Sequence, residues 1–156
     1  MKNLLSFALL LLSLELTAQN ALVSAVEAKN YSGVKKMVTS GSDLNQPFDM
    51  EGQKMTVLSL AAIRGDIEMV NLLIQKGAIV TALVDSKDAL MFAAKGGNRE
   101  IVELLLNKGA NRMNECKEGT ARDMAVKAGN VDISVILENE MQNISNQAKA
   151  RKKLKK

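Results

Sequence analysis

The chain has no histidine and no tryptophan, and its 156 residues include a single cysteine, a single proline and a single tyrosine. Without histidine, the chain alone supplies no imidazole acid or base, no His-activated nucleophile and no His-ligated zinc or iron. One thiol, Cys116, forms neither an internal disulfide nor a thiolate metal cage. We interpret Cys116 as incidental, with a disulfide to a partner or to a second copy as the alternative.

Acidic residues are abundant, but most of them alternate with basic ones. Glu100 and Glu103, which lie close to Lys108, are typical of solvated helix faces rather than of paired catalytic carboxylates. Gly96–Gly97 and Gly109 precede no Lys-Ser or Lys-Thr pair, which excludes a phosphate-binding loop. We therefore expect a non-enzymatic protein with no catalytic residue, no metal site and no cofactor.

Aromatic side chains are equally scarce, with three Phe beside the one Tyr, although 47% of the residues are hydrophobic. The core must therefore consist of aliphatic side chains, including the nine Met. Small and aliphatic side chains suit closely stacked helices.

The first 18 residues have the composition of a secretory signal peptide. Lys2 provides a positive start, residues 4–14 are apolar except for two serines, and Leu16-Thr17-Ala18 ends in a small residue. We predict a signal peptide over residues 1–18, cleavage after Ala18, and export to the periplasm or the medium of a bacterial-type cell. An uncleaved N-terminal anchor helix is the alternative.

Charge divides the remaining chain into a body and a tail. Residues 19–140 carry 14 basic and 16 acidic side chains, whereas residues 141–156 carry six basic side chains and no acidic one. We predict a basic C-terminal tail that contacts an anionic envelope surface, or that only solubilises the chain. The tail has no aromatic residue to stack on bases, so we expect no nucleic-acid binding. Its basic residues are Lys149, Arg151, Lys152, Lys153, Lys155 and Lys156.

The body contains an internal repeat. Gly65, Gly97 and Gly129 recur at an interval of 32 residues, and the same interval separates three candidate helix caps and three alanines upstream of them. Such a period predicts an array of stacked, structurally equivalent units. The caps and alanines are Thr56, Asp88, Thr120, Ala61, Ala93 and Ala125.

The unit over residues 55–78 is well formed and resembles the ankyrin repeat. Thr56 caps a first helix, Ala61 and Ala62 allow neighbouring helices to approach, and Gly65 lets the chain reverse before a second, apolar helix that Gly77 ends. The resemblance implies an all-α ankyrin-repeat solenoid of stacked helix-turn-helix units with projecting loops. We place the domain at residues 19–140, with repeats at about 20–45, 52–81, 86–113 and 117–140.

Several positions depart from the family pattern. The first unit has Lys29 in place of the turn glycine, and we expect Asn30 to take the left-handed conformation instead. No unit has the Thr-Pro-Leu-His sequence that the family favours, which implies weaker individual repeats. Arg122 replaces an apolar residue, so we expect the last repeat to face solvent in part, and Met141 replaces its closing glycine.

Residues 45–55 form an insertion that contains Pro47 and that we expect to project as a loop. In the ankyrin family, partners contact the loop tips and the exposed side of the first helices. Phe48, Met55 and Leu83 have an alternative role, in which they fold back over the helix ends. The candidate partner-binding residues are Phe48, Met50, Met55, Ile63, Arg64, Leu83, Val84, Asp85, Lys87, Lys95, Met113 and Lys127.

These observations predict a monomeric, exported protein whose concave ankyrin surface binds another protein. Two alternatives remain open. One is an accessory, inhibitor or immunity subunit of an exported enzyme, and the other is an envelope-associated scaffold held by the basic tail.

Overall fold

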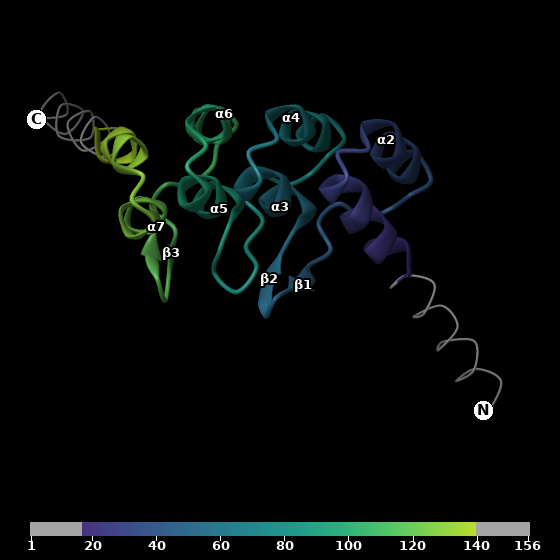
Figure 1. The fold of residues 1–156 in the computed structure, drawn as a ribbon, viewed down its shortest axis with the longest axis horizontal. Coiled ribbons are helices and arrows are strands. Elements are labelled where there is room, and N and C mark those ends of the chain that lie inside the picture. Colours follow the sequence, from purple (N-terminus) through teal and green to yellow (C-terminus); the bar gives the residue numbers. More distant parts are fainter. Residues whose placement is uncertain (1–16, 140–156) are drawn as a thin grey trace, which may run out of the picture.

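The computed structural model describes residues 17–139, which form a row of helix pairs (Figure 1). The predicted signal peptide, except for Thr17 and Ala18, and the predicted basic tail lie outside the described residues. None of the helices within residues 17–139 is long and apolar enough to cross a membrane.

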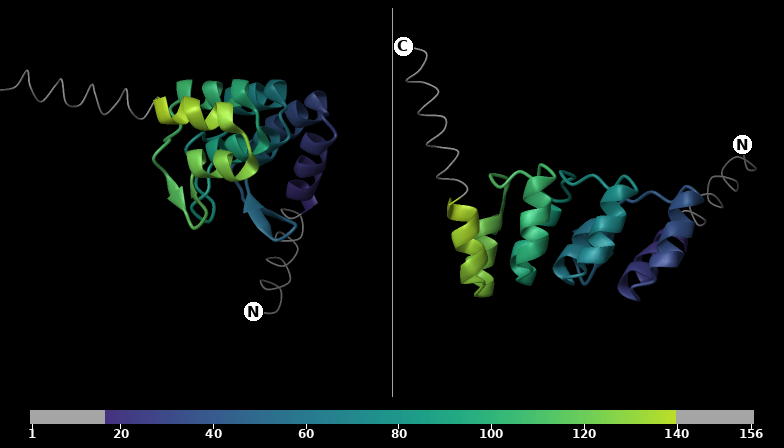
Figure 2. Two further views of the ribbon diagram at one scale, coloured as in Figure 1. Left: turned by 60° about the vertical axis from the view of Figure 1, so that its left-hand side comes forward. Right: turned by 90° about the horizontal axis from the view of Figure 1, so that it is seen from above.

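Each repeat consists of an inner helix followed by an outer helix. The inner helices are residues 17–27, α3 (Val57–Ile63), α5 (Ala89–Gly96) and α7 (Ala121–Ala128). The outer helices are α2 (Tyr31–Thr39), α4 (Ile67–Gln75), α6 (Arg99–Asn107) and residues 131–139. This arrangement confirms the predicted all-α repeat stack, and the view from above in Figure 2 shows the pairs side by side.

Short hairpins precede two of the inner helices. β1 (Phe48–Met50) pairs antiparallel with β2 (Gln53–Met55), and β3 (Glu115–Cys116) pairs with β4 (Gly119–Thr120). Between them, Val84 and Lys87 form an isolated bridge. All three turns project on the same side of the stack (Figure 1), so the insertion around Pro47 forms the projecting loop that the sequence predicts. We call the surface formed by these turns and the exposed side of the inner helices the inner face.

Side-chain caps begin the inner helices where the sequence predicts them. The Thr56 hydroxyl accepts a hydrogen bond from Ser59 N at 3.3 Å, and the Asp88 carboxylate accepts one from Met91 N at 3.0 Å. Thr120 caps α7 in a reciprocal capping box with Asp123. Each cap satisfies backbone N–H groups that have no partner inside the helix, so local sequence sets where each inner helix begins.

The core runs along the stack between the inner helices. Ala61, Ala93 and Ala125 are buried there, as is Phe92, a large side chain that is fully buried. Because alanine permits close approach, α5 packs tightly on both α3 and α7, whereas the outer helices α4 and α6 make few contacts with each other. The inner helices therefore hold the array together.

The turn of the first repeat corrects one prediction. Lys29 itself is left-handed, with φ 54°, and Asn30 has φ −82°. Asn30 instead caps α2, accepting a hydrogen bond from Gly33 N at 2.9 Å. The cap requires non-helical backbone at Asn30, so the left-handed residue falls one position earlier, as it does at Gly65, Gly97 and Gly129.

The last repeat ends the stack with polar side chains. Arg122, 40% exposed, occupies the position at which Leu58 and Leu90 are buried under the following repeat. Its Nε lies 2.6 Å from Glu138 Oε2, which ties α7 to residues 131–139. The prediction that this repeat faces solvent in part is confirmed.

Candidate protein-binding surface

Two apolar residues on the projecting loops are well exposed. Leu83 is 55% exposed and Met113 is 63% exposed. Both lie in the connections that follow an outer helix, Leu83 directly before the bridge between Val84 and Lys87 and Met113 two residues before β3. Solvent-exposed apolar side chains on a rigid frame are what a protein interface uses as anchors.

Two predicted tip residues are instead buried, which corrects the expectation that they are exposed. Met55 is 4% exposed because it lies opposite Phe48 in the hairpin and turns into the core. Val84 is 9% exposed, and its backbone N–H and C=O both bond to Lys87, so the tight turn directs its side chain inward. Phe48 and Met50 are half-buried against the same core. The fold-back alternative therefore holds for Met55 and not for Leu83.

The predicted inner-helix residues occupy the last turns of α3, α5 and α7 or the residue beyond. Ile63 is half-buried on the core, whereas Arg64, Lys95 and Lys127 are exposed. Arg64 Nη2 lies 3.4 Å from Glu27 Oε1, so the charge at this end of the inner face is paired.

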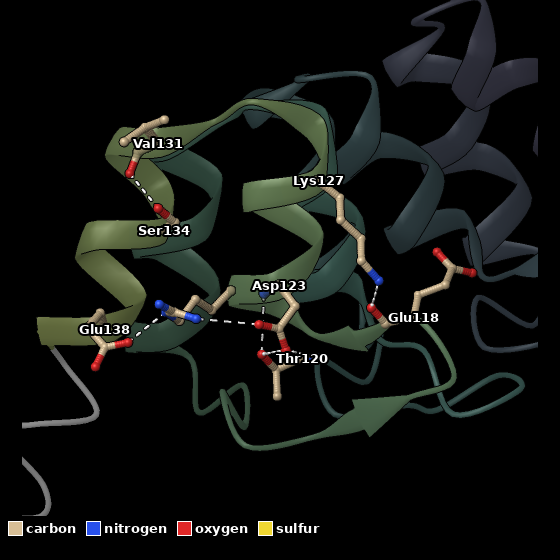
Figure 3. Close-up of polar contacts among 8 residues, drawn as sticks. Glu118, Thr120, Asp123, Lys127, Val131, Ser134 and Glu138 are labelled. Atoms are coloured by element: carbon tan, nitrogen blue, oxygen red, sulfur yellow. Dashed lines mark hydrogen bonds and ion pairs between the residues drawn. The ribbon is translucent and has the colours of Figure 1, made fainter.

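Three lysines meet around Glu118, in the turn between β3 and β4. Lys87 forms an ion pair with the Glu118 carboxylate. Figure 3 shows the Lys127 ammonium, which donates a hydrogen bond to the Glu118 backbone carbonyl. The hydrogen bond from Lys87 is the main reason that the pKa of Glu118 lies below its ordinary value, and the charges of Lys95 and Lys127 act in the same direction. The structure therefore brings Lys87 and Lys95 together with Lys127 of the next repeat.

A small hollow lies between the ends of α5 and α7 and this turn. Its volume is about 120 Å³, and it is lined by Lys95, Glu118, Met124, Lys127 and Ala128. Met124, 2% exposed, forms an apolar floor beneath the charged groups. Residues 17–139 contain no cluster of acidic or thiol side chains suited to a metal ion.

Asp85 lies beside this cluster on a tight turn. It is exposed and left-handed, with φ 49°, as is its neighbour Ser86, with φ 65°. The bridge between Val84 and Lys87 holds both residues in this conformation.

Sequence reasoning missed Glu118, although it joins the predicted lysines. The signal was present in the repeat register, because Glu118 occupies the tip position that Ser86 occupies one repeat earlier. A comparison of tip residues along the register would have placed a carboxylate beside Lys87 and Lys127.

Comparison with known families agrees with the geometry. A family model described as ankyrin repeats in three copies matches residues 22–115 and 58–149. A search of curated proteins found no match to this chain. Ankyrin-repeat domains are typically non-catalytic and bind other proteins.

Proposed function

The chain belongs to the ankyrin-repeat family, and we propose that it is an exported, non-enzymatic module that binds a protein partner through its inner face. The observation that carries the proposal is the exposure of two apolar side chains, Leu83 and Met113, in the connections that lead to the inner helices. Family membership supports the general role, and these side chains support the inner face as its place.

The inner face has the anatomy of a standard protein interface. Apolar anchors at its projecting loops are surrounded by charged groups, which include Arg64, Lys95 and Lys127. The caps and the packed alanines hold these groups in place before a partner arrives. Little conformational entropy is then lost on docking, so a modest surface suffices for useful affinity.

Export is supported by the composition of the first 18 residues. Cleavage after Ala18 would leave Gln19 as the first residue, and its side-chain amide donates to Gln46 O at 3.1 Å, so this end of the domain keeps a contact. Intact mass of the chain recovered from the periplasm or medium tests this. A chain that begins at Met1 contradicts cleavage.

Point variants test the inner face. Leu83→Asp and Met113→Asp place charge on exposed anchors, so we expect an unchanged circular dichroism spectrum and loss of the partner captured by crosslinking from the envelope fraction. Val131→Asp is the control, since Val131 is exposed on an outer helix and is 66% accessible. Equal capture by all four proteins contradicts the proposal.

A second role follows from the charge of the tail. Six basic residues without an acidic one favour an envelope-associated scaffold, with about 1 kcal/mol of attraction per basic residue at an anionic surface. Deletion of residues 148–156 should then release the protein, and attachment of the full chain should weaken with salt. Unchanged, salt-insensitive localisation excludes this role.

A further inference from the structure

Charge is distributed unequally along the inner face. The equivalent position in the last turn of successive inner helices holds Glu27, Ile63, Lys95 and Lys127. Glu27 is paired with Arg64, so the N-terminal half is close to neutral. Positive charge therefore gathers at the C-terminal half, between α5 and α7.

The lysines there outnumber their acidic partners. Glu118 is the carboxylate among the residues that line the hollow, and it is engaged by Lys87. Lys127 bonds to a backbone carbonyl rather than to a carboxylate, and within residues 17–139 the Lys95 ammonium has neither an ion pair nor a hydrogen bond. Two ammonium groups therefore border the hollow without a carboxylate of their own.

The hollow has the size of a side-chain site. At about 120 Å³ it is smaller than the roughly 300 Å³ at which small-molecule pockets begin. Its floor is the apolar Met124 and its rim carries Lys95 and Lys127. A glutamate or aspartate fits this chemistry, because its methylene groups contact the floor while its carboxylate meets the ammonium groups.

We propose that the inner face between α5 and α7 binds an acidic segment of the protein partner, with one carboxylate seated between Lys95 and Lys127. The inference rests on the proposed protein-binding function and adds the chemistry of the partner. The chain's own tail is unsuited to the hollow, because its six basic residues are repelled by the same lysines. Asp85 and Glu115 are exposed, so the loop tips carry charges of both signs. The preference for an acidic segment therefore comes from Lys95 and Lys127, at the C-terminal ends of α5 and α7.

Selection from a random peptide library displayed on phage tests the proposal with the full chain. We expect the wild-type protein to enrich acidic peptides. For a labelled peptide so selected, Lys95→Glu combined with Lys127→Glu should weaken binding at least about tenfold, as expected when two attractions become repulsions. The affinity of the wild-type protein for this peptide should also fall as salt is added.

Lys76→Glu combined with Lys108→Glu is the matched control. These lysines also lie at helix C-terminal ends, those of α4 and α6, so the change in net charge and in helix-dipole interaction is equivalent. Circular dichroism checks that both double variants fold. We expect the control to bind the acidic peptide as the wild type does.

The remaining outcomes separate this inference from the general function. Peptides enriched without acidic residues, or bound equally by the Lys95 and Lys127 variant, overturn the inference and leave protein binding intact. Tighter binding of an oligothymidylate strand at the same lysines overturns it in favour of a nucleic acid. Failure to select any peptide counts against the protein-binding function itself, and with it against this inference.

Discussion

The side-chain amide of Asn98 donates a hydrogen bond to the carbonyl oxygen of Ala62, 2.9 Å away in the preceding repeat. Asn130 donates in the same way to Ala94 O, also at 2.9 Å. Each carbonyl lies in the last turn of an inner helix, where it also accepts a bond from the backbone N–H of the turn glycine, Gly65 or Gly97. These bonds join successive repeats.

The close approach of the Asn98 side chain explains why position 65 of the preceding repeat is a glycine. Gly65 is left-handed, with φ 73°, and a Cβ added there would lie 2.4 Å from Asn98 Oδ1. Both the backbone conformation and the close approach of the amide therefore require glycine.

Asn98→Ala should lower the free energy of unfolding by about 0.5–1.5 kcal/mol, because it removes a hydrogen bond between repeats while the Ala62 carbonyl keeps its bond from Gly65 N. The loss is not a capping effect, since the Asn98 side chain makes no hydrogen bond within α6. Urea denaturation of the purified protein measures the change.

Asn71→Ala is the control for this joint. Asn71 donates to Ile67 O within its own helix, so its removal affects no contact between repeats. If Asn71→Ala and Asn98→Ala lowered the free energy of unfolding equally, the hydrogen bond between repeats would contribute nothing to stability.

The polar contact between the first and second repeats uses different residues. Asp66 occupies the position of Asn98 and Asn130, and a carboxylate has no proton to donate. It accepts instead, from the Tyr31 hydroxyl at 3.1 Å, and Lys29 Nζ lies 4.0 Å away. The first pair of repeats thus has Lys29 where the later ones have glycine, and Asp66 where they have asparagine. A polar contact between the repeats is still present.

Lys29→Gly should raise the free energy of unfolding by about 0.5 kcal/mol. The strain of left-handed backbone at lysine is relieved, and the greater freedom of glycine in the unfolded chain offsets part of that gain. The ion pair with Asp66 is exposed on the lysine side and too long to matter much. Thermal denaturation followed by circular dichroism measures the shift. A lower midpoint would mean that the Lys29 charge matters more than its backbone strain.

Ala93→Leu should lower the free energy of unfolding by about 1–3 kcal/mol or more, because Ala93 is fully buried where α5 packs on its neighbours. The added carbons force α3, α5 and α7 apart along the core. Urea denaturation compares this variant with Ala128→Leu, which lies at the exposed end of α7 and should change little. A tolerated Ala93→Leu contradicts close helix packing as the source of stability.

Two aspartates at helix caps should affect the pH dependence of stability with opposite signs. The backbone N–H of Thr120, and then its hydroxyl, hold the pKa of Asp123 below its ordinary value. Its contribution is present above the ordinary aspartate pKa and is lost as pH falls through the lowered one. Burial raises the pKa of Asp88, so its ionisation removes stability as pH rises from the ordinary value through the raised one.

Unfolding midpoints measured from acidic to neutral pH distinguish the two. As pH rises, the unfolding midpoint of Asp123→Asn should increase less than that of the wild type. Over the same range, the midpoint of Asp88→Asn should increase relative to that of the wild type. Curves parallel to that of the wild type for both variants would contradict these assignments.

Much of the fold could be predicted because its signals are local. Thr56, Asp88 and Thr120 cap helices through hydrogen bonds three residues along the chain, and the turn glycines act through their own backbone dihedrals. The left-handed Lys29 was missed because asparagine favours two competing roles, and the cap at Asn30 prevailed over the left-handed turn. The burial of Met55 and Val84 was missed for a different reason, since alternation in a two- or three-residue strand does not reveal which face meets the core.

The amino-acid sequence by itself determined the repeat period, because equivalent residues recur at a constant interval, and the helix caps and the insertion around Pro47, because these depend on neighbours within a few residues. Only the tertiary structure decided which charges meet. Lys87 and Glu118 are 31 positions apart, and they pair with each other and lie beside Lys95 and Lys127 only because the stacked inner helices place equivalent positions of adjacent repeats next to one another. Electrostatic energy depends on distance in space, which the order of residues along the chain does not specify.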